Sequence, residues 1–157
     1  MLFNYGIYKT MPKDIPFIKG VDIIQFDVVG KTGIADGKEL GGYVNTHALL
    51  SRRVTKFNDS RTIICAVGNS DYYSVNVNFL KSDNLNYLHF LCGIMNSFVI
   101  DYFVRKIIYL SVNLHHINSI PIIPYNQQVT ELAIKISKDT TNQSLRNELD
   151  VLVAKLY

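Results

Sequence analysis

The sequence predicts an α+β domain in which strands precede helices. Short runs of alternating apolar and polar residues fill the first half of the chain, and the last thirty residues carry apolar side chains at helical spacing. A long apolar stretch, residues 84–106, joins the two halves. At 157 residues and 48% hydrophobic content, we expect one compact domain. Residues 1–126 form its larger region, and residues 127–157 form a C-terminal helical hairpin.

Alternation predicts strands at residues 21–29 and 74–80, and β-rich composition predicts a third at residues 61–67. In residues 74–80, we expect the apolar side chains on one face and the asparagines on the other. Residues 30–42 hold five of the nine glycines and predict a loop or a loose hairpin.

Residues 84–106 predict one long buried helix, capped by Asn84 or Asn86. Asn96 and Asp101 would be costly in lipid, so we do not expect a membrane span. Asn96 and Ser97 lie near the packed side, where we interpret them as satisfied packing contacts. The expected buried face comprises Leu88, Leu91, Cys92, Met95, Phe98, Val99 and Tyr102.

Residues 113–126 show no periodicity, and two amphipathic helices follow them, joined by "KDTTNQ" into a hairpin. The expected buried residues are Val129, Leu132, Ala133 and Ile136 in the first helix, and Leu145, Leu149, Leu152, Val153 and Leu156 in the second.

The two cysteines and the chain ends indicate a cytoplasmic protein. Cys65 and Cys92 lie in apolar surroundings and read as buried reduced thiols. The N-terminus lacks the pattern of a signal peptide. The abrupt ending "AKLY" predicts a domain excised from a longer protein.

Motifs for catalysis, metals or nucleotides are weak or absent. "VVGKTG" resembles part of a phosphate-binding loop, but Gln25 stands where the motif needs its first glycine. The adjacent pair His115 and His116 has no cysteine or acidic partner close in sequence for a metal. We therefore expect a non-catalytic chain without metal or cofactor.

The charge pattern favours a binding module. The formal net charge is only +3, but residues 49–62 concentrate four cations against Asp59. Arginine, lysine, asparagine and serine are residue types that hold phosphates or read base edges.

Four segments in order resemble the C-terminal specificity domain of TaqI-like and type IIG restriction-modification proteins. "PFIKGVDIIQFD" (16–27) is similar to that family's "plYEGK-iiqfd", and "RRVTKFNDSRTIICAV" (52–67) to its "R-ia--tN-RT-iaai". "YLHFLCGIMNSFVIDYFVRK" with "NLHHINSIPIIP" resembles its "LNS" helix and "iPiP" segment. "RNELDVLVAKLY" (146–157) resembles its "r-eiDalVa-LYgL" ending. The first segment departs from the pattern, because "FIKG" moves the basic residue ahead of the glycine, to Lys19.

The resemblance implies a target recognition domain for double-stranded DNA, with residues 1–126 as the recognition region. A separate adenine methyltransferase domain, in cis or in trans, would bind S-adenosylmethionine and flip the target base. The candidate phosphate contacts are Arg52, Arg53, Lys56, Lys19, Lys31 and Lys38, and the candidate base or backbone contacts are Asn113, His115 and His116. Asn58 and Arg61 belong to the "N-x-x-R-T" block, and Arg61 either contacts DNA or pairs with a carboxylate.

Three alternatives remain open on the sequence. Half of a type I restriction specificity subunit would share the recognition fold. A protein-interaction domain would dock through the C-terminal helices. An autonomous hydrolase using His115 or His116 is the remaining class.

Overall fold

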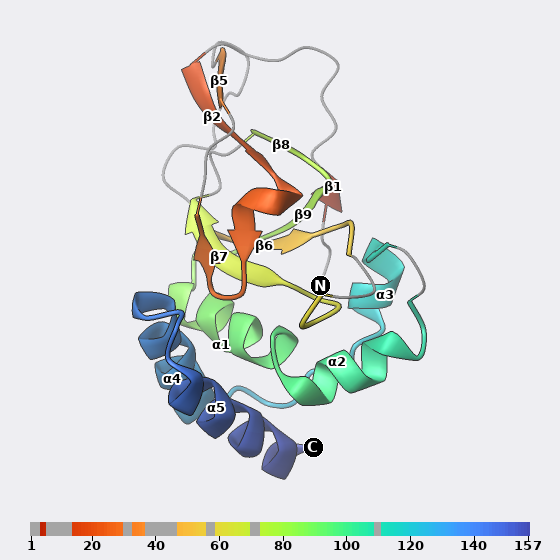
Figure 1. Ribbon diagram of the computed structural model, residues 1–157, viewed down its shortest axis with the longest axis vertical. Coiled ribbons are helices and arrows are strands. Elements are labelled where there is room, and N and C mark those ends of the chain that lie inside the picture. Colours follow the sequence, from red (N-terminus) through yellow and green to blue (C-terminus); the bar gives the residue numbers. More distant parts are fainter. Residues whose placement is uncertain are drawn as a thin grey trace.

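The computed structural model describes residues 4–5, 14–29, 33–36, 47–55, 59–69, 73–108 and 111–157. Within these ranges the chain is α+β, as predicted, with strands first and α-helices after them. Figure 1 shows the helices gathered beneath the strands, so that sheet and helices form separate layers. Most of the glycine-rich stretch lies outside the described residues, and so do four predicted site residues: Lys31, Lys38, Lys56 and Asn58.

A four-stranded antiparallel sheet forms the centre of the molecule. Its strands, in spatial order, are β1 (Asn4–Tyr5), β9 (Val77–Lys81), β6 (His47–Arg52) and β7 (Cys65–Asn69). Both faces of β6 are buried, because Leu49 packs against the helices while Ala48 and Leu50 pack on the opposite side. This two-sided burial explains why the strand is a continuous apolar run rather than an alternating one.

A smaller three-stranded sheet lies above the first in Figure 1. It contains β5 (Gly33–Asp36), β2 (Asp14–Lys19) and β8 (Tyr73–Val75), with β2 antiparallel to β5 and parallel to β8. Ile18 at the end of β2 joins Leu50 and Phe79 of the central sheet in a second hydrophobic cluster. The two sheets therefore share one apolar interior, separate from the one beneath.

The three predicted strands are shorter than expected. Residues 21–29 form the 3-10 helix η1 (Gly20–Asp22) and the hairpin of β3 (Ile23–Ile24) and β4 (Asp27–Val28). In the second predicted segment, residues 61–67, the strand begins only at Cys65 and continues to Asn69 as β7. Phe26 reverses the chain at a φ of 70°, and Asn76, at a φ of 61°, separates β8 from β9. Within β9, Val77 and Phe79 lie on one face and Asn78 on the other, as predicted, but Asn78 is fully buried.

The single long helix predicted for residues 84–106 is also wrong. The segment forms α1 (Leu85–Met95) and α2 (Phe98–Arg105), which meet at a bend of 60°. Asn84 caps α1 by accepting from the Tyr87 amide, and Ser97 caps α2 by accepting from the Ile100 amide. Beyond the bend the predicted face is turned outward, leaving Phe98 and Tyr102 56% and 58% exposed.

Among the described helices, none has by itself both the length and the apolar composition to cross a membrane. α1 and α2 have the required length and apolar composition only when they are taken together, across the bend. In this structure α1 is packed between the central sheet and the remaining helices.

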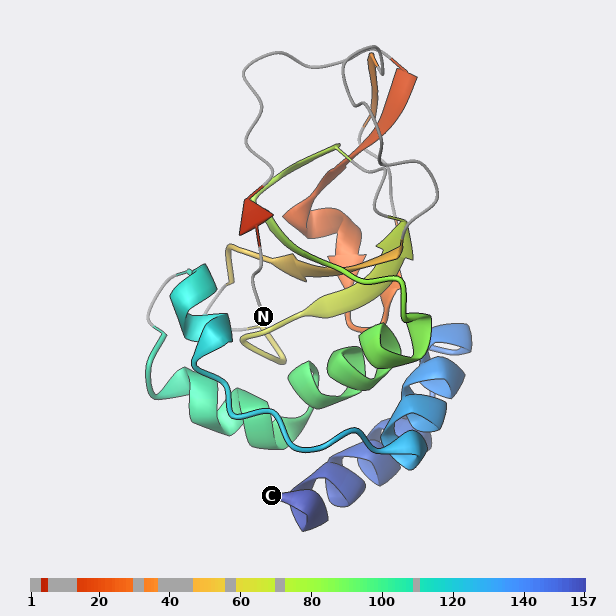
Figure 2. The same ribbon diagram turned by 180° about the vertical axis from the view of Figure 1, so that it is seen from behind.

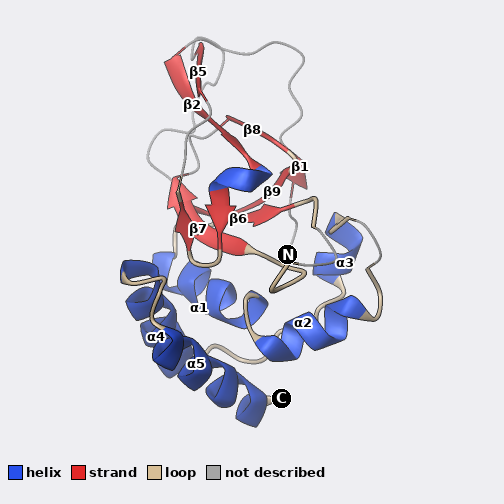
Figure 3. Ribbon diagram, viewed as in Figure 1, coloured by secondary structure: helices blue, strands red, loops and turns tan. Residues whose placement is uncertain are grey.

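The C-terminal hairpin is confirmed as α4 (Gln127–Lys138) and α5 (Gln143–Leu156). The predicted face of α4 is buried throughout, whereas Leu156 at the end of α5 is 37% exposed, contrary to expectation. Residues 113–126 are not wholly irregular, because they contain the short helix α3 (Leu114–Asn118). Figure 2 shows the segment after α3 running back across the helical layer to α4, and Figure 3 shows the strand and helix layers by colour.

α1 and α4 approach closely because α1 carries a glycine at the contact. A Cβ added at Gly93 would lie 2.9 Å from Val129 Cγ1 and 3.4 Å from Ala133 Cβ. Val129 is β-branched and fully buried, so its methyl group has little room to move.

Gly93→Ala should therefore lower the free energy of unfolding by about 1–2 kcal/mol, since the overpacking cost exceeds the gain in helix propensity. Urea denaturation followed by circular dichroism measures the change. The double variant Gly93→Ala/Val129→Ala should be more stable than the sum of the two single changes predicts. Strict additivity would contradict this packing assignment.

Candidate functional site

The Asn96 side chain joins the helical layer to the edge of the central sheet. β7 is an edge strand, and the outward N–H and C=O of Cys65 need partners. Asn96 Oδ1 accepts from the Cys65 amide at 3.2 Å, while Asn96 Nδ2 donates to the carbonyls of Cys65 and Cys92 at 2.8 and 3.0 Å. Asn96 is only 3% exposed, so the amide replaces a neighbouring strand at this point.

Two free thiols flank this contact. Asn96 Nδ2 lies 3.3 Å from Cys65 Sγ and 3.4 Å from Cys92 Sγ. Both cysteines are unpaired and buried, as predicted. Burial raises the pKa of the Cys65 thiol well above its ordinary value, and the neighbouring Cys92 raises it further. The thiol therefore stays protonated and acts as part of the core.

Asp101 ties α2 to the segment before β7. Its Oδ1 accepts from the Thr62 amide at 2.5 Å, and its Oδ2 accepts from Arg105 Nε at 2.8 Å. Arg105 Nη2 also donates to the carbonyl of Asp59 at 3.0 Å. A carboxylate that is only 5% exposed is thus matched by one amide and one cation.

Asp150 of α5 binds two partners at the helix break. Its Oδ2 accepts from Arg61 Nη2 at 2.9 Å, and its Oδ1 accepts from the amide of Phe98, the first residue of α2, at 2.6 Å. Arg61 Nε also donates to the Asn96 carbonyl at 3.3 Å. Of the two roles open to Arg61 on the sequence, pairing with a carboxylate is the one seen. We call Arg61, Thr62, Cys65, Asn96, Asp101 and Asp150 the junction network.

The β3–β4 turn contacts α5 beside this network. Phe26, in the left-handed conformation, is 4% exposed and donates its amide to the Cys65 carbonyl at 2.9 Å. Such a conformation costs a residue other than glycine about 1–3 kcal/mol. The burial and the hydrogen bond hold it, and the turn brings the neighbouring Gln25 Oε1 to Arg146 Nη1 of α5.

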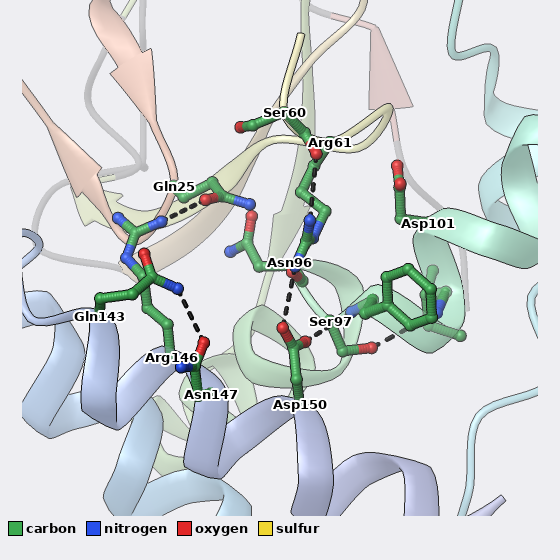
Figure 4. Close-up of polar contacts among 12 residues, drawn as sticks. Gln25, Ser60, Arg61, Asn96, Ser97, Asp101, Gln143, Arg146, Asn147 and Asp150 are labelled. Carbon is green, nitrogen blue, oxygen red and sulfur yellow. Dashed lines mark hydrogen bonds and ion pairs between the residues drawn. The ribbon is translucent and has the colours of Figure 1, made fainter.

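Two hollows of about 120 and 300 Å³ open between these elements, and they share Gln25, Ser60 and Arg146. We call them together the arginine cleft. Its charged lining residues are Arg52, Asp59, Arg61, Arg146 and Asp150. Figure 4 shows the inner part, with Gln25 and Arg146 facing Ser60 and Arg61. Burial lowers the pKa of the Arg146 guanidinium, the nearby cation Arg61 lowers it further, and Asp150 opposes the shift.

The structure brings three predicted phosphate contacts together above the cleft. Arg52 ends β6 and donates Nε to the Ile23 carbonyl at 2.6 Å. Arg53 follows it, and its amide bonds the Asn76 carbonyl at 2.9 Å. Lys19 is exposed and directly precedes Gly20. Gly20 lies close to the same carbonyl, since a Cβ added to it would be 3.3 Å from Asn76 O. The backbone at Arg53 and at Gly20, next to Lys19, therefore approaches the same carbonyl of Asn76.

Asn113, His115 and His116 lie next to Arg53, because the Val112 amide donates to the Arg53 carbonyl at 2.7 Å. The Asn113 amide donates to His116 Nδ1 at 3.2 Å at the start of α3. The two imidazole rings lie 3.9 Å apart between centroids. Burial lowers the pKa of His116 and the neighbouring His115 lowers it further, which favours the neutral ring.

Among the residues of the site that sequence reasoning missed are Gln25, Asp101, Arg146 and Asp150. Gln25 and Asp101 lie within segments read as one strand and one helix, where their partners on other elements were not visible. Arg146 and Asp150 carried a usable signal, because each directly follows an apolar position of the α5 stripe. Residues four positions apart lie on the same side of a helix, so Arg146 and Asp150 both border the buried face of α5.

The fold and the site define an α+β domain whose helical layer is joined to its sheet by buried polar contacts, with a charged cleft beside them. No family model matches the chain, and no curated protein matches it either. Within the described ranges, no three histidine, cysteine, aspartate or glutamate side chains gather as metal ligands.

Asn96→Ala should destabilise the protein by about 2–3 kcal/mol, because it leaves the buried Cys65 amide without a partner. Chemical denaturation with urea gives the value. Asn118→Ala, at an exposed position of α3, is the matched control and should stay within about 0.5 kcal/mol of the parent. Equal losses in the two variants would refute the role of Asn96.

Arg61→Gln and Asp150→Asn should be coupled by about 1 kcal/mol in a double-mutant cycle, since both side chains are about a quarter exposed. Asp150→Asn should be the more costly single change, because it also weakens the bond to the Phe98 amide. Thermal or urea unfolding of the four proteins measures the cycle, and independent effects would rule out the pair.

Proposed function

We propose that this chain is the DNA target recognition domain of an adenine-N6 methyltransferase or of a combined restriction-modification enzyme. The observation that carries the proposal is where the four resembling segments meet. Gln25 comes from the first segment, Arg61 and Cys65 from the second, Asn96 from the third and Asp150 from the fourth, and all five line or border the arginine cleft.

This convergence offers one structural explanation for the residues that carry the resemblance. The "LNS"-like residues Met95, Asn96 and Ser97 end one helix, bind the sheet edge and start the next helix. Asp150 of the last segment then caps that second helix. Residues that are far apart in the sequence thus meet in one junction network. This supports the interpretation of the four segments as the signature of one domain.

The side of the molecule that we assign to DNA is the strand-rich side (Figure 1). Arg52, Arg53 and Lys19 lie there, with Asn113 and His115 close to Arg53. Cations of this kind supply sequence-independent phosphate contacts, while asparagine and histidine side chains are suited to base edges. Methylation and its S-adenosylmethionine would belong to a separate catalytic domain, acting on DNA in the cytoplasm.

A second candidate function is protein docking through the C-terminal hairpin, as in a type I specificity subunit or a pure interaction domain. A hollow of about 360 Å³ lies between α4 and α5. Both charge signs line it, and Val151 in its wall is 55% exposed. A chain that ignores DNA and binds a partner through this face would favour that function.

The first test is fluorescence anisotropy of a labelled mixed-sequence duplex across a salt series. Binding that weakens steeply with salt is expected, because phosphate contacts release counterions. Arg53→Gln should weaken binding to all duplexes alike and reduce the logarithmic salt slope by about one. Lys155→Gln removes the same charge from α5 and should leave the slope unchanged. Failure of the parent chain to bind at low salt would contradict the proposal.

A further inference from the structure

The arginine cleft carries more positive charge than its own acids neutralise. Asp150 is engaged by Arg61, and Asp59 accepts from Thr55 Oγ1 at 3.4 Å. Among the described residues, no carboxylate lies within 4 Å of the guanidinium of Arg52 or Arg146. Two cations therefore face the cleft without an ion-pair partner from the described chain.

Arg146 is held in a fixed orientation by neutral partners. Its Nε and Nη2 donate to the Thr140 carbonyl at 3.1 and 2.6 Å, and its Nη1 donates to Gln25 Oε1. The guanidinium carbon lies 5.9 Å from the centre of the Phe26 ring. A guanidinium has five N–H donors, so donors remain on Nη1 and Nη2 after these three bonds. Because its orientation is already fixed, little further ordering is needed to bind an anion.

The remaining polar groups of the cleft complement Arg146 as donors. Gln25 uses its oxygen on Arg146, which leaves both hydrogens of its amide nitrogen, and Figure 4 shows this nitrogen on the side away from the Arg146 guanidinium. The exposed Ser60 lines both hollows and has a hydroxyl that can donate. Asp59 lines the same hollow as Arg52 and is its acidic residue.

We propose that the arginine cleft binds a phosphate group of the DNA backbone, through Arg146, Gln25 and Ser60 with Arg52 at its mouth. The assignment rests on the proposed function and adds a contact that the basic pattern of the sequence does not contain. A tetrahedral oxyanion accepts from several donors at once, and guanidinium groups match it with paired hydrogen bonds. Partial burial strengthens each of these bonds over its value in water.

Bound there, a phosphate would touch the β3–β4 turn and α5 together. These two elements come from opposite ends of the chain and contact each other through Gln25 and Arg146. The duplex would thus be positioned against both the strand layer and the helical layer. Backbone contacts of this type fix the register of a protein on DNA without reading sequence.

Ser60→Glu tests the assignment without removing an arginine. The new carboxylate reaches the unpaired guanidinium groups and occupies the cleft in place of phosphate, so the variant should be at least as stable as the parent. Ser144→Glu places the same charge at an exposed position of α5 and is the matched control. Urea denaturation confirms that both variants are folded before binding is measured.

Two readouts separate the cleft from the proposed function. In the first, inorganic phosphate is titrated into the full chain while the arginine Nε–Hε signals are followed by NMR, with chloride at equal ionic strength as reference. Saturable shifts of Arg52 and Arg146 are expected in the parent and in Ser144→Glu, and not in Ser60→Glu. Shifts that chloride reproduces would overturn the site.

The second readout is duplex binding across a salt series. Ser60→Glu should lower the affinity about tenfold and the logarithmic salt slope by about one, and Ser144→Glu should change neither. If the two variants behave alike while phosphate still saturates the cleft, its ligand is free phosphate and the DNA assignment is overturned. If the parent binds phosphate but no duplex, the proposed function fails, and the DNA contact fails with it.

Discussion

The pairing of one side-chain amide with one peptide group governs the architecture of this domain. Asn96 satisfies the outward N–H and C=O of Cys65 at the edge of the central sheet. Helix α1 ends at Met95, directly before Asn96, and Ser97 then starts a new helix in another direction. A buried amide that satisfies both donor and acceptor fixes the relative position of two layers more sharply than apolar packing, which tolerates small displacements.

Charged side chains surround this amide and act on the same junction. Asp101 and Asp150 each accept one backbone amide and one arginine, so neither carboxylate is left without a cation. Asp150 also lies at the N-terminus of α2, where the helix dipole favours negative charge. Since Asp150 belongs to the last helix and Thr62 precedes β7, the network connects residues almost ninety positions apart. The candidate DNA surface and the arginine cleft are both built on the elements that this network holds.

Local patterns predicted the parts of this fold that are locally determined. The α4–α5 hairpin, the burial of α4 and the Asn84 cap of α1 follow from spacing within a dozen residues. The break at Asn96 does not, because the partner of Asn96 is a peptide group thirty-one positions earlier. The β3–β4 hairpin was missed for the same reason, since Phe26 adopts its strained conformation around a bond to Cys65. The pairing of Arg61 with a carboxylate was one of two readings, but its partner Asp150 could not be named without the tertiary structure.

The covering of α1 by α4 has a consequence for how the chain is made. Helix α1 presents apolar side chains to the sheet on one side and to Val129, Ala133 and Ile136 on the other. On the ribosome, the sheet and α1 emerge well before α4, so one flank of α1 meets water until the last helices arrive. A nascent chain at this stage exposes hydrophobic surface. Such surface promotes aggregation and is the kind that chaperones bind. Docking of the α4–α5 hairpin would cover this surface and so end the binding of such a chaperone.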